Sequence, residues 1–452
     1  MKLVMVGSGY VGLVSGVCFA DFGFDVVCVD VDEAKIARLE TGELPIYEPG
    51  LDQLMAENVS AGRLTFSTDL ATAAADADLV FIAVGTPSRR GDGEADLTYV
   101  FAAAKEVAHA IKPGTVVVIK STVVVGTCRK VREIIAAERP DLEFSVASNP
   151  EFLREGSAIE DFMRPDRVVI GVHDKRAEVA LRRAYRPLYL RDSPMVVTSL
   201  ENAEIIKYAS NAFLALKVTF INEVADLCEA VDGNVQEVAR AIGLDGRIGS
   251  KFLHAGPGFG GSCFPKDTRA FAATGHKHGS RLRLIEAVID INESRKRRLA
   301  DRILEELESV SQAKVAVLGV AFKPNTDDVR EAPSLDIIPR LVGAGVSVVA
   351  HDPEARQQAE PLLKGIGWAD DAYEAAEGVD VVVVLTEWNE YRGLNLRKLA
   401  SRMRGRTMVD LRNIYRADDL AGSGLVYISI GRPRIDSGSE QSSFSETELV
   451  QH

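Results

Sequence analysis

The chain has 452 residues, which is too long for one ordinary domain and predicts two or three. Hydrophobic residues make up 46% and charged residues 26%, and no apolar run reaches the roughly 18 residues that cross a bilayer. The formal net charge of −13 argues against nucleic acid as a partner, because binding a phosphate backbone needs a basic face. It still allows a phosphorylated small molecule held by a few Arg and Lys side chains.

The first residues, MKLVMVGSGYVG, lead from a short apolar run into a glycine loop where a signal peptide would have its cleavage site. They therefore predict a strand, and we expect the protein in the cytoplasm. The five cysteines are odd in number and have no paired spacing, so we expect neither a disulfide framework nor a metal site. Four of them lie in apolar or helical contexts and are predicted to be buried: Cys18, Cys28, Cys128 and Cys228.

Strands alternate with helices over the first part of the chain, which predicts a parallel, doubly wound sheet. After the strand at residues 2–6 come a helix rich in small residues and a second strand, DVVCVD, that ends at Asp30. Further strands are expected within 79–87, 115–122 and 144–150, with 166–172 as the last strand of this region. The first domain is therefore expected to span residues 1–198.

The loop between the first strand and helix has the spacing Gly7-x-Gly9-x-x-Gly12, and an acidic residue, Asp30, follows about 20 positions later. In this context Gly7 permits the turn, Gly9 lets the backbone approach a pyrophosphate, and Gly12 allows close helix packing. The Asp30 carboxylate can accept both ribose hydroxyls and would repel a 2′-phosphate, so NAD is expected and not NADP. The predicted cofactor loop comprises Gly7, Gly9, Tyr10, Val11 and Gly12.

From residue 199 the pattern changes to a segment of some 30 residues without Gly or Pro, with apolar positions at helical spacing. It predicts one helix of roughly 45 Å, long enough to join two domains and to offer a dimer surface. Lys207 and Asn211 share one face of this helix and lie among apolar neighbours. We expect residues 199–296 to form a central helical domain.

The segment GPGFGGSCFPKD at 256–267 predicts a tight, irregular loop that carries Cys263, with Lys266 and Asp267 close by. A cationic or glycine-loop setting favours the thiolate, which is the reactive form of cysteine. In a dinucleotide-dependent enzyme, a nucleophilic thiol indicates aldehyde-level chemistry through a thiohemiacetal and a thioester. A free thiol in a packing loop is the alternative.

The strand–helix pattern restarts at KVAVLGVAF (314–322) and continues to about residue 435, without the three-glycine spacing. The expected fold class is therefore α/β, with two Rossmann-like doubly wound domains joined by a long central helix. The second of these domains is expected at 297–435. The polar residues 436–452 predict a disordered tail.

At this point the chain resembles the UDP-glucose/GDP-mannose dehydrogenase family over roughly residues 1–435. The resemblance is carried, in family order, by GSGYVG, LPIYEPGL, FIAVGTP, KSTV, NPEFLREG, KYASNAFLALKVTFINE, RIGSKFL, GFGGSCFPKD and AFKPNTDDVRE. It implies oxidation of a sugar C6 alcohol to a carboxylate in two hydride steps, with two NAD and one water. RIGSKFL and the cysteine segment resemble the UDP-glucose enzymes more than the GDP-mannose ones, so UDP-glucose is the expected substrate and UDP-glucuronate the product.

The resemblance also implies roles for individual residues. Cys263 would be the nucleophile, Asp267 would help to activate the hydrolytic water, and Lys207, helped by Asn211, would stabilise the oxyanion. Thr122 and Glu151 would line the reacting centre, with Glu151 as a candidate general base. Further cofactor contacts are expected from Lys35, Thr86, Thr122, Glu155 and Arg330.

The nucleotide sugar would lie between the domains, clamped by basic side chains that suit a diphosphate. Its expected contacts are Phe152, Leu153, Lys207, Phe252, Gly260, Lys323 and Arg412, with Arg247 reaching in from a neighbouring subunit of a homodimer or a multiple of dimers. Some relatives carry Lys where this chain has His254.

Three other functions fit part of the pattern. Oxidation of GDP-mannose or another nucleotide sugar would use the same residues. The 6-phosphogluconate and 3-hydroxyacid dehydrogenases have a similar architecture but oxidise secondary alcohols without a cysteine nucleophile. A non-catalytic nucleotide-sensing protein would lack the nucleophile or the oxyanion lysine, and neither is missing here.

Overall fold

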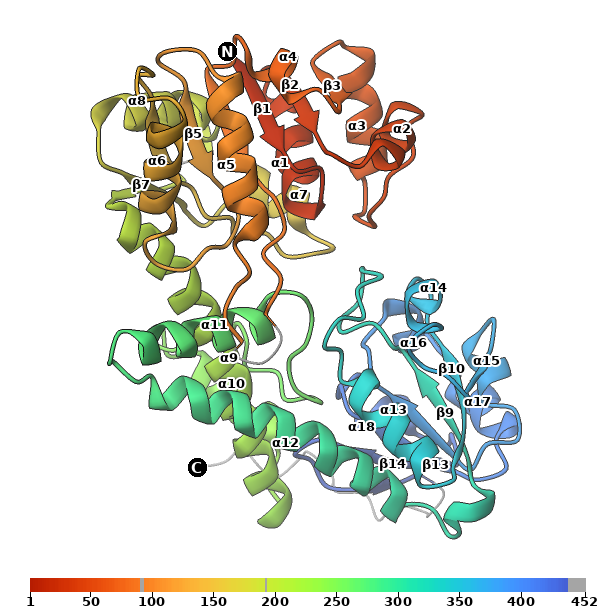
Figure 1. Cartoon of the computed structure of the whole chain (residues 1–452). Coiled ribbons are helices and arrows are strands. Elements are labelled where there is room, and N and C mark those ends of the chain that lie inside the picture. Colours follow the sequence, from red (N-terminus) through yellow and green to blue (C-terminus); the bar gives the residue numbers. More distant parts are fainter. Residues whose placement is uncertain (90–92, 192, 438–452) are drawn as a thin grey trace. The chain divides into compact units, whose positions relative to one another are not determined.

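The computed structural model describes residues 1–89, 93–191 and 193–437. The chain divides into two compact units. The first contains residues 1–213 and 266–286, and the second contains residues 214–265 and those from 287 onward (Figure 1). The predicted tail lies outside the described residues from position 438 on.

The first unit is built on one sheet in the order β3-β2-β1-β4-β5-β6-β7-β8. Its strands are β1 (Lys2–Val6), β2 (Asp25–Val29), β3 (Leu64–Ser67), β4 (Leu79–Ile82), β5 (Val116–Ile119), β6 (Ser145–Ser148), β7 (Val168–Val172) and β8 (Met195–Thr198). Central strands such as VVVI of β5 are apolar throughout because helices cover both faces of the sheet.

Two hydrophobic cores flank this sheet. In β1, Leu3 and Met5 point into one core, and Val4 and Val6 point into the other. One core is closed by α1 (Tyr10–Asp21), α2 (Glu33–Glu40), α3 (Leu51–Ser60), α7 (Ala158–Met163) and α8 (Lys175–Ala184). The other is closed by α4 (Leu70–Ala74), α5 (Thr98–Ala110) and α6 (Thr127–Glu138). The doubly wound architecture is therefore confirmed.

One strand prediction is wrong. Residues 168–172 are not the last strand, because β8 follows and pairs in parallel with β7, while β7 runs antiparallel to β6. A short 3-10 helix, η1 (Arg186–Arg191), precedes β8. β8 (MVVT) is partly exposed, and its apolar run of three residues is shorter than the runs of the inner strands.

The second unit carries another sheet, in the order β11-β10-β9-β12-β13-β14-β15. Its strands are β9 (Lys314–Leu318), β10 (Ser347–His351), β11 (Gly367–Trp368), β12 (Val381–Val384), β13 (Thr407–Asp410), β14 (Val426–Ser429) and β15 (Ile435–Asp436). The surrounding helices are α13 (Ser334–Gly343), α14 (Arg356–Ala359), α15 (Ala372–Ala375), α16 (Asn389–Arg392), α17 (Leu396–Arg402) and α18 (Ala417–Leu420), with the 3-10 helix η2 (Val310–Gln312) before β9. The predicted second doubly wound domain is thus present.

Helix α9 (Leu200–Ala230) is continuous over 31 residues, as the absence of Gly and Pro predicts. The remaining helices are α10 (Val235–Gly243), α11 (Phe264–Lys277) and α12 (Arg283–Glu305). Helix α11 corrects the prediction of a loop over residues 256–267. Only the residues up to Cys263 are irregular, and Lys266 and Asp267 lie in the first turns of the helix.

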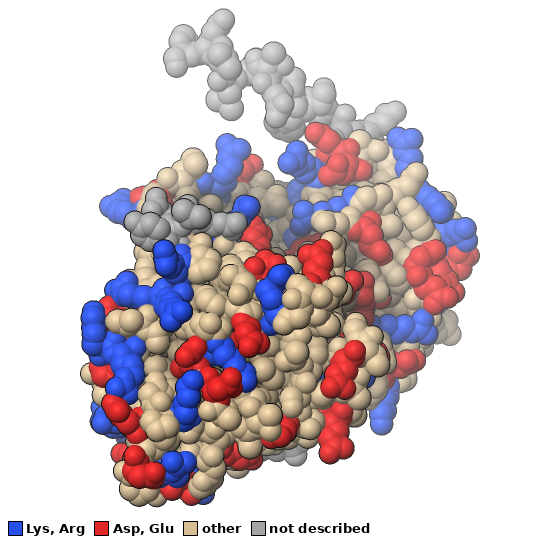
Figure 2. Space-filling model, turned by 90° about the horizontal axis from the view of Figure 1, so that it is seen from above, with Lys and Arg blue, Asp and Glu red and all other residues tan. Residues whose placement is uncertain are grey.

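Acidic and basic side chains lie side by side over the face of the molecule shown in Figure 2. Within α8, Lys175 and Arg182 both form ion pairs with Glu178. Within the described ranges, no helix has the length and hydropathy needed to span a membrane.

Candidate active site

The glycine loop after β1 has the geometry of a dinucleotide site. Gly7 has φ +100°, and a Cβ at Gly12 would lie 1.8 Å from the carbonyl oxygen of Gly7, so packing alone requires both glycines. At Gly9, in contrast, no atom lies within 4 Å of where a Cβ would be. Its missing side chain therefore leaves the backbone open to a ligand at the start of α1, where free N–H groups attract a phosphate.

Asp30 lies at the end of β2, beside this loop. Its carboxylate accepts hydrogen bonds from Ser8 N–H at 2.8 Å, Asp32 N–H at 3.1 Å and Lys35 Nζ at 2.9 Å. Burial by itself would raise the pKa of Asp30, but the hydrogen bonds from Lys35, Asp32 and Ser8 outweigh it and lower the pKa. The Ser8 hydroxyl is buried without a hydrogen-bond partner among the described residues. An ionised acid and an unsatisfied hydroxyl both suit a ribose and phosphate ligand.

Thr86 and Thr122 follow β4 and β5, and the Thr86 hydroxyl donates to the backbone oxygen of Thr122 at 2.9 Å. In the sheet order, β1 and β4 are neighbours whose connections leave in opposite directions. Ligands of doubly wound sheets bind at this point, at the carboxyl ends of the strands. The glycine loop and Thr86 both follow strands that end there.

A buried ion pair joins two of the predicted catalytic residues. Lys207 Nζ donates to Glu151 Oε1 at 2.9 Å, and Leu153 N–H donates to Glu151 Oε2 at 2.5 Å. The Lys207 and Glu151 side chains are only 4% and 6% exposed. Burial would raise the pKa of Glu151, but the Lys207 ammonium and these hydrogen bonds lower it below its usual range. Glu151 is therefore an ionised carboxylate in a water-poor site.

A second pair lies one turn further along α9. Asn211 Nδ2 donates to Asp267 Oδ2 at 2.6 Å, and Lys266 Nζ contacts Asp267 Oδ1 at 2.7 Å. Asp267 is 1% exposed, so its carboxylate is fixed by these two partners. The first unit thus places Glu151, which follows β6, and Asp267, of α11, beside Lys207 and Asn211 on adjacent turns of α9.

Cys263 belongs to the second unit and immediately precedes α11. Its sulfur lies 3.6 Å from the Ser262 hydroxyl. The backbone before it is held by side chains of two helices. Asn222 of α9 accepts from Gly256 N–H at 2.8 Å, and Arg295 of α12 donates to Gly256 O at 2.7 Å.

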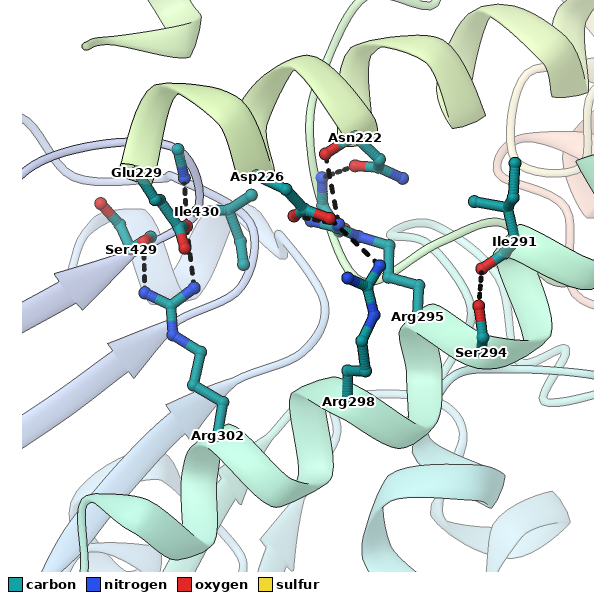
Figure 3. A network of polar contacts seen from close by, with 12 residues as sticks. Asn222, Asp226, Glu229, Ile291, Ser294, Arg295, Arg298, Arg302, Ser429 and Ile430 are labelled. Carbon is teal, nitrogen blue, oxygen red and sulfur yellow. Dashed lines mark hydrogen bonds and ion pairs between the residues drawn. The ribbon is translucent and has the colours of Figure 1, made fainter. Parts of the chain in front are cut away.

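Asn292, one turn before Arg295 on α12, holds the same segment further along. Its side chain accepts from Phe259 N–H at 2.9 Å and donates to Phe259 O at 3.1 Å. Figure 3 shows how α9 and α12 are themselves joined, with Arg295 and Arg298 both reaching Asp226. The cysteine segment is therefore fixed by a framework that the sequence did not reveal.

Other predicted substrate residues lie along the same segment. Gly261 N–H donates to the carbonyl oxygen of Arg330, and a Cβ at Gly260 would lie 2.4 Å from Glu331 O. This packing alone explains the glycine at 260. Arg412 donates to Phe322 O at 2.8 Å, directly before Lys323, and Lys323 Nζ lies 5.3 Å from the Phe322 ring centroid.

The other residues that the sequence predicts to contact the substrate or the cofactor lie in several separate segments. Phe252 has φ +65° and its ring packs 5.9 Å from that of Phe264. Arg247 is paired with Asp245, and its side chain is 90% exposed. Phe152 and Leu153 follow Glu151, Glu155 is half-buried, and His254 is exposed.

The second unit has a similar loop after β9, but the acid at the end of its neighbouring strand, Asp352, accepts hydrogen bonds from that loop. Gly319 has φ +89°, and Asp352, at the end of β10, accepts from Val320 N–H and Ala321 N–H at 2.6 and 2.9 Å. It also accepts from the Trp388 indole at 3.2 Å. These bonds tie the carboxylate to its own loop.

Comparison with known proteins agrees with this arrangement. Residues 1–189, 201–294 and 316–417 match three domains described as the NAD binding, central and UDP binding domains of the UDP-glucose/GDP-mannose dehydrogenase family. Together with the glycine loop and Asp30, these matches define an NAD-dependent dehydrogenase.

Similar proteins cover almost the whole chain. A UDP-glucose 6-dehydrogenase of Rhizobium meliloti (strain 1021) is 57% identical over 436 residues, which is 96% of this chain and 100% of that protein. The UDP-glucose 6-dehydrogenase TuaD of Bacillus subtilis (strain 168) is 47% identical, over 96% of this chain and 94% of its own. A solved UDP-glucose dehydrogenase from Pyrobaculum islandicum has a TM-score of 0.88 at 42% identity and covers 96% of this chain and 98% of its own. The chain belongs to the UDP-glucose/GDP-mannose dehydrogenase family.

Proposed function

We propose that the protein oxidises UDP-glucose to UDP-glucuronate, with Cys263 as covalent nucleophile. The observation that carries the substrate assignment is the full-length, 57% identical relative that is named for this sugar nucleotide. NAD, bound at the glycine loop beside Asp30, supplies the acceptor for the hydride that leaves the substrate carbon in each of two steps.

The first step turns the C6 alcohol into an aldehyde, and the hydroxyl proton must go to a base. Glu151 is the proposed acceptor because it is ionised and buried. The Lys207 ammonium beside it donates to the developing alkoxide, and such a preorganised donor stabilises an oxyanion strongly in a water-poor site. Thr122 lines the same centre.

The second step needs a tetrahedral carbon. The Cys263 thiolate adds to the aldehyde carbon and forms a thiohemiacetal, which becomes a thioester when its hydride leaves. The position of Cys263 just before α11 supports this role, since a helix N-terminus favours the thiolate. Asp267 takes a proton from a water molecule, which attacks the thioester carbon. The carbon–sulfur bond then breaks, which regenerates the Cys263 thiolate and releases the carboxylate product.

The other predicted contacts complete the proposal. Lys35, Thr86, Glu155 and Arg330 would contact the cofactor. The diphosphate would be held by Lys323 and Arg412, and the rest of the sugar nucleotide by the other predicted substrate residues. The domain boundaries and the cytoplasmic location likewise stay predictions.

We also propose that α9 forms a dimer interface. Phe213, Phe220 and Leu227 recur at seven-residue spacing on α9 and are 60%, 50% and 62% exposed. Residues spaced by seven lie on one face of a helix, so they form an apolar stripe that a second copy would cover. Arg247 would then reach the partner's substrate, as predicted.

An NADH-coupled assay tests the substrate assignment. The purified chain should form two NADH for each UDP-glucose consumed, with UDP-glucuronate as the product. A ratio of one NADH per sugar, or faster turnover of GDP-mannose, would contradict the proposal.

A further inference from the structure

A buried lysine, Lys120, follows the end of β5, and its charge interacts with both members of the Glu151–Lys207 pair. It is 3% exposed. Its ammonium donates to Asn149 Oδ1 and to the Tyr185 hydroxyl, both at 3.2 Å. Within the described part of the chain, no carboxylate lies within ion-pair distance of this ammonium. A buried charge without a counter-ion is costly, so this arrangement calls for an explanation beyond packing.

The hydrogen-bond partner of Lys120 begins the segment that carries Glu151. Three further hydrogen bonds hold Asn149 in place. Its backbone N–H donates to Ile119 O and its side-chain amide donates to Val169 O. The Tyr185 hydroxyl donates to Asn149 Oδ1 at 2.6 Å. Glu151 follows two residues later. Lys120 is therefore held in a fixed position relative to Glu151.

The titratable groups that face Lys120 come from several elements. Cys18 of α1 and Tyr185 after α8 both have pKa values raised by burial, so both are neutral near neutral pH. Phe162 of α7 contributes only its ring, 5.8 Å away. The charged groups that act on Lys120 are the Glu151 carboxylate and the Lys207 ammonium.

A further cation, Arg167, packs on the same aromatic ring as Lys207. The Arg167 guanidinium stacks 3.7 Å from the Phe152 ring centroid, and Lys207 Nζ lies 5.3 Å from the same centroid. Two buried cations, Lys207 and Lys120, thus act on the Glu151 carboxylate, whereas the charge of Arg167 interacts with that of Asp166. Burial lowers the pKa of Lys120, the Glu151 carboxylate opposes that shift and repulsion from Lys207 adds to it, so the pKa is about 8.

We propose that Lys120 is a positioning residue. Its positive charge keeps Glu151 ionised as the proton acceptor and repels the positive charge of Lys207. This inference rests on the proposed function, because it assigns Lys120 to the acid–base step at Glu151. In this proposal Lys120 does not contact the substrate or the cofactor, because its buried ammonium is directed to Asn149 and Tyr185. Its effect reaches the reaction only through the charge state of the pair.

Three variants separate the charge of Lys120 from its hydrogen bonds. K120Q keeps an amide that can donate to Asn149 and Tyr185 but removes the charge, K120M removes both, and K120R keeps the charge. K112M is the matched control, because it makes the same change at a lysine of the same unit whose ammonium donates to the backbone oxygen of Asp76.

The readout is kcat/KM for UDP-glucose against pH, measured with the full chain. Without the Lys120 charge, Glu151 binds its proton more readily. The acid limb of the kcat/KM curve should therefore move up by about one pH unit in K120Q and K120M, which is at the low end of the effect of a nearby charge. At a fixed pH on that limb the rate should fall about tenfold, while K120R and K112M keep the wild-type limb. An unchanged limb in K120Q, or an equal loss of rate at every pH, would overturn the proposal.

A measurement on the wild-type chain avoids any folding defect of the variants and needs no turnover. The carboxyl carbon of Glu151, followed by ¹³C NMR and assigned with E151Q, should respond when Lys120 loses its proton near pH 8. No response in that range would refute the coupling. If this response is present but UDP-glucose is not oxidised, the coupling stands and the proposed function fails.

Discussion

The side chain of Asn292 should control the order of the segment that carries Cys263. It makes two hydrogen bonds to the backbone of Phe259, and it is only 3% exposed. In N292A both backbone groups lose their partner in a buried place, at a cost of about 1–3 kcal/mol for each group that stays unsatisfied. Partial rehydration of the segment reduces this, so we expect the free energy of local opening to fall by about 2 kcal/mol.

Amide hydrogen exchange followed by mass spectrometry measures this opening directly. A loss of about 2 kcal/mol corresponds to roughly thirtyfold faster exchange over residues 256–262. S294A is the matched control on the same helix, because the Ser294 hydroxyl donates to Ile291 O within α12 (Figure 3). The kcat of N292A should also fall, since Cys263 is no longer held, whereas NAD binding in the first unit should not change.

Equal exchange over this segment in N292A and the wild type would refute the reasoning. It would mean that the other contacts, from Asn222 and Arg295 to Gly256, hold the segment by themselves. Faster exchange in S294A as well would point to a general loosening of α12 and would contradict a local clamp.

Four shorter predictions concern the cofactor, the catalytic groups and assembly. Because Asp30 is ionised, NAD should exceed NADP by at least about tenfold in kcat/KM, and equal rates would contradict its role. K207A should lower kcat by roughly 10² to 10³ with little change in KM, and a pure KM effect would make Lys207 a binding residue. C263A should bind NAD and UDP-glucose but form no glucuronate, as measured by product chromatography; near-normal product would exclude covalent catalysis there. F220D/L227D should sediment as a monomer, and an unchanged dimer would place the interface elsewhere.

The sequence predicts those parts of the fold that depend on local pattern. The glycine loop follows from three glycines between an apolar strand and a helix, and α9 follows from the absence of Gly and Pro. The start of α11 was missed because Pro265 suggests a loop, although proline fits the first turn of a helix, where its missing N–H costs no hydrogen bond.

The contacts of the candidate site could not be derived in the same way. Glu151 and Lys207 are 56 positions apart, and so are Asn211 and Asp267, so no local periodicity connects them. Only the family resemblance suggested that they act together. The sequence shows Lys120 and Asn292 only as polar residues among apolar neighbours. Many exposed residues have the same kind of neighbours, so this pattern does not predict a buried role.

Asp30 and Asp352, the acids at the ends of β2 and β10, differ in how many further hydrogen bonds their carboxylates can accept. A carboxylate has about four acceptor sites. Asp352 already receives five hydrogen bonds, from three backbone groups of its own corner, the N–H of Ala355 and the Trp388 indole, so it is saturated. Asp30 receives three from residues that the structure describes and has capacity for a hydroxyl donor. Of these two acids, only Asp30 has an acceptor site left for a ribose, so two corners of the same shape differ in the ligands they can accept.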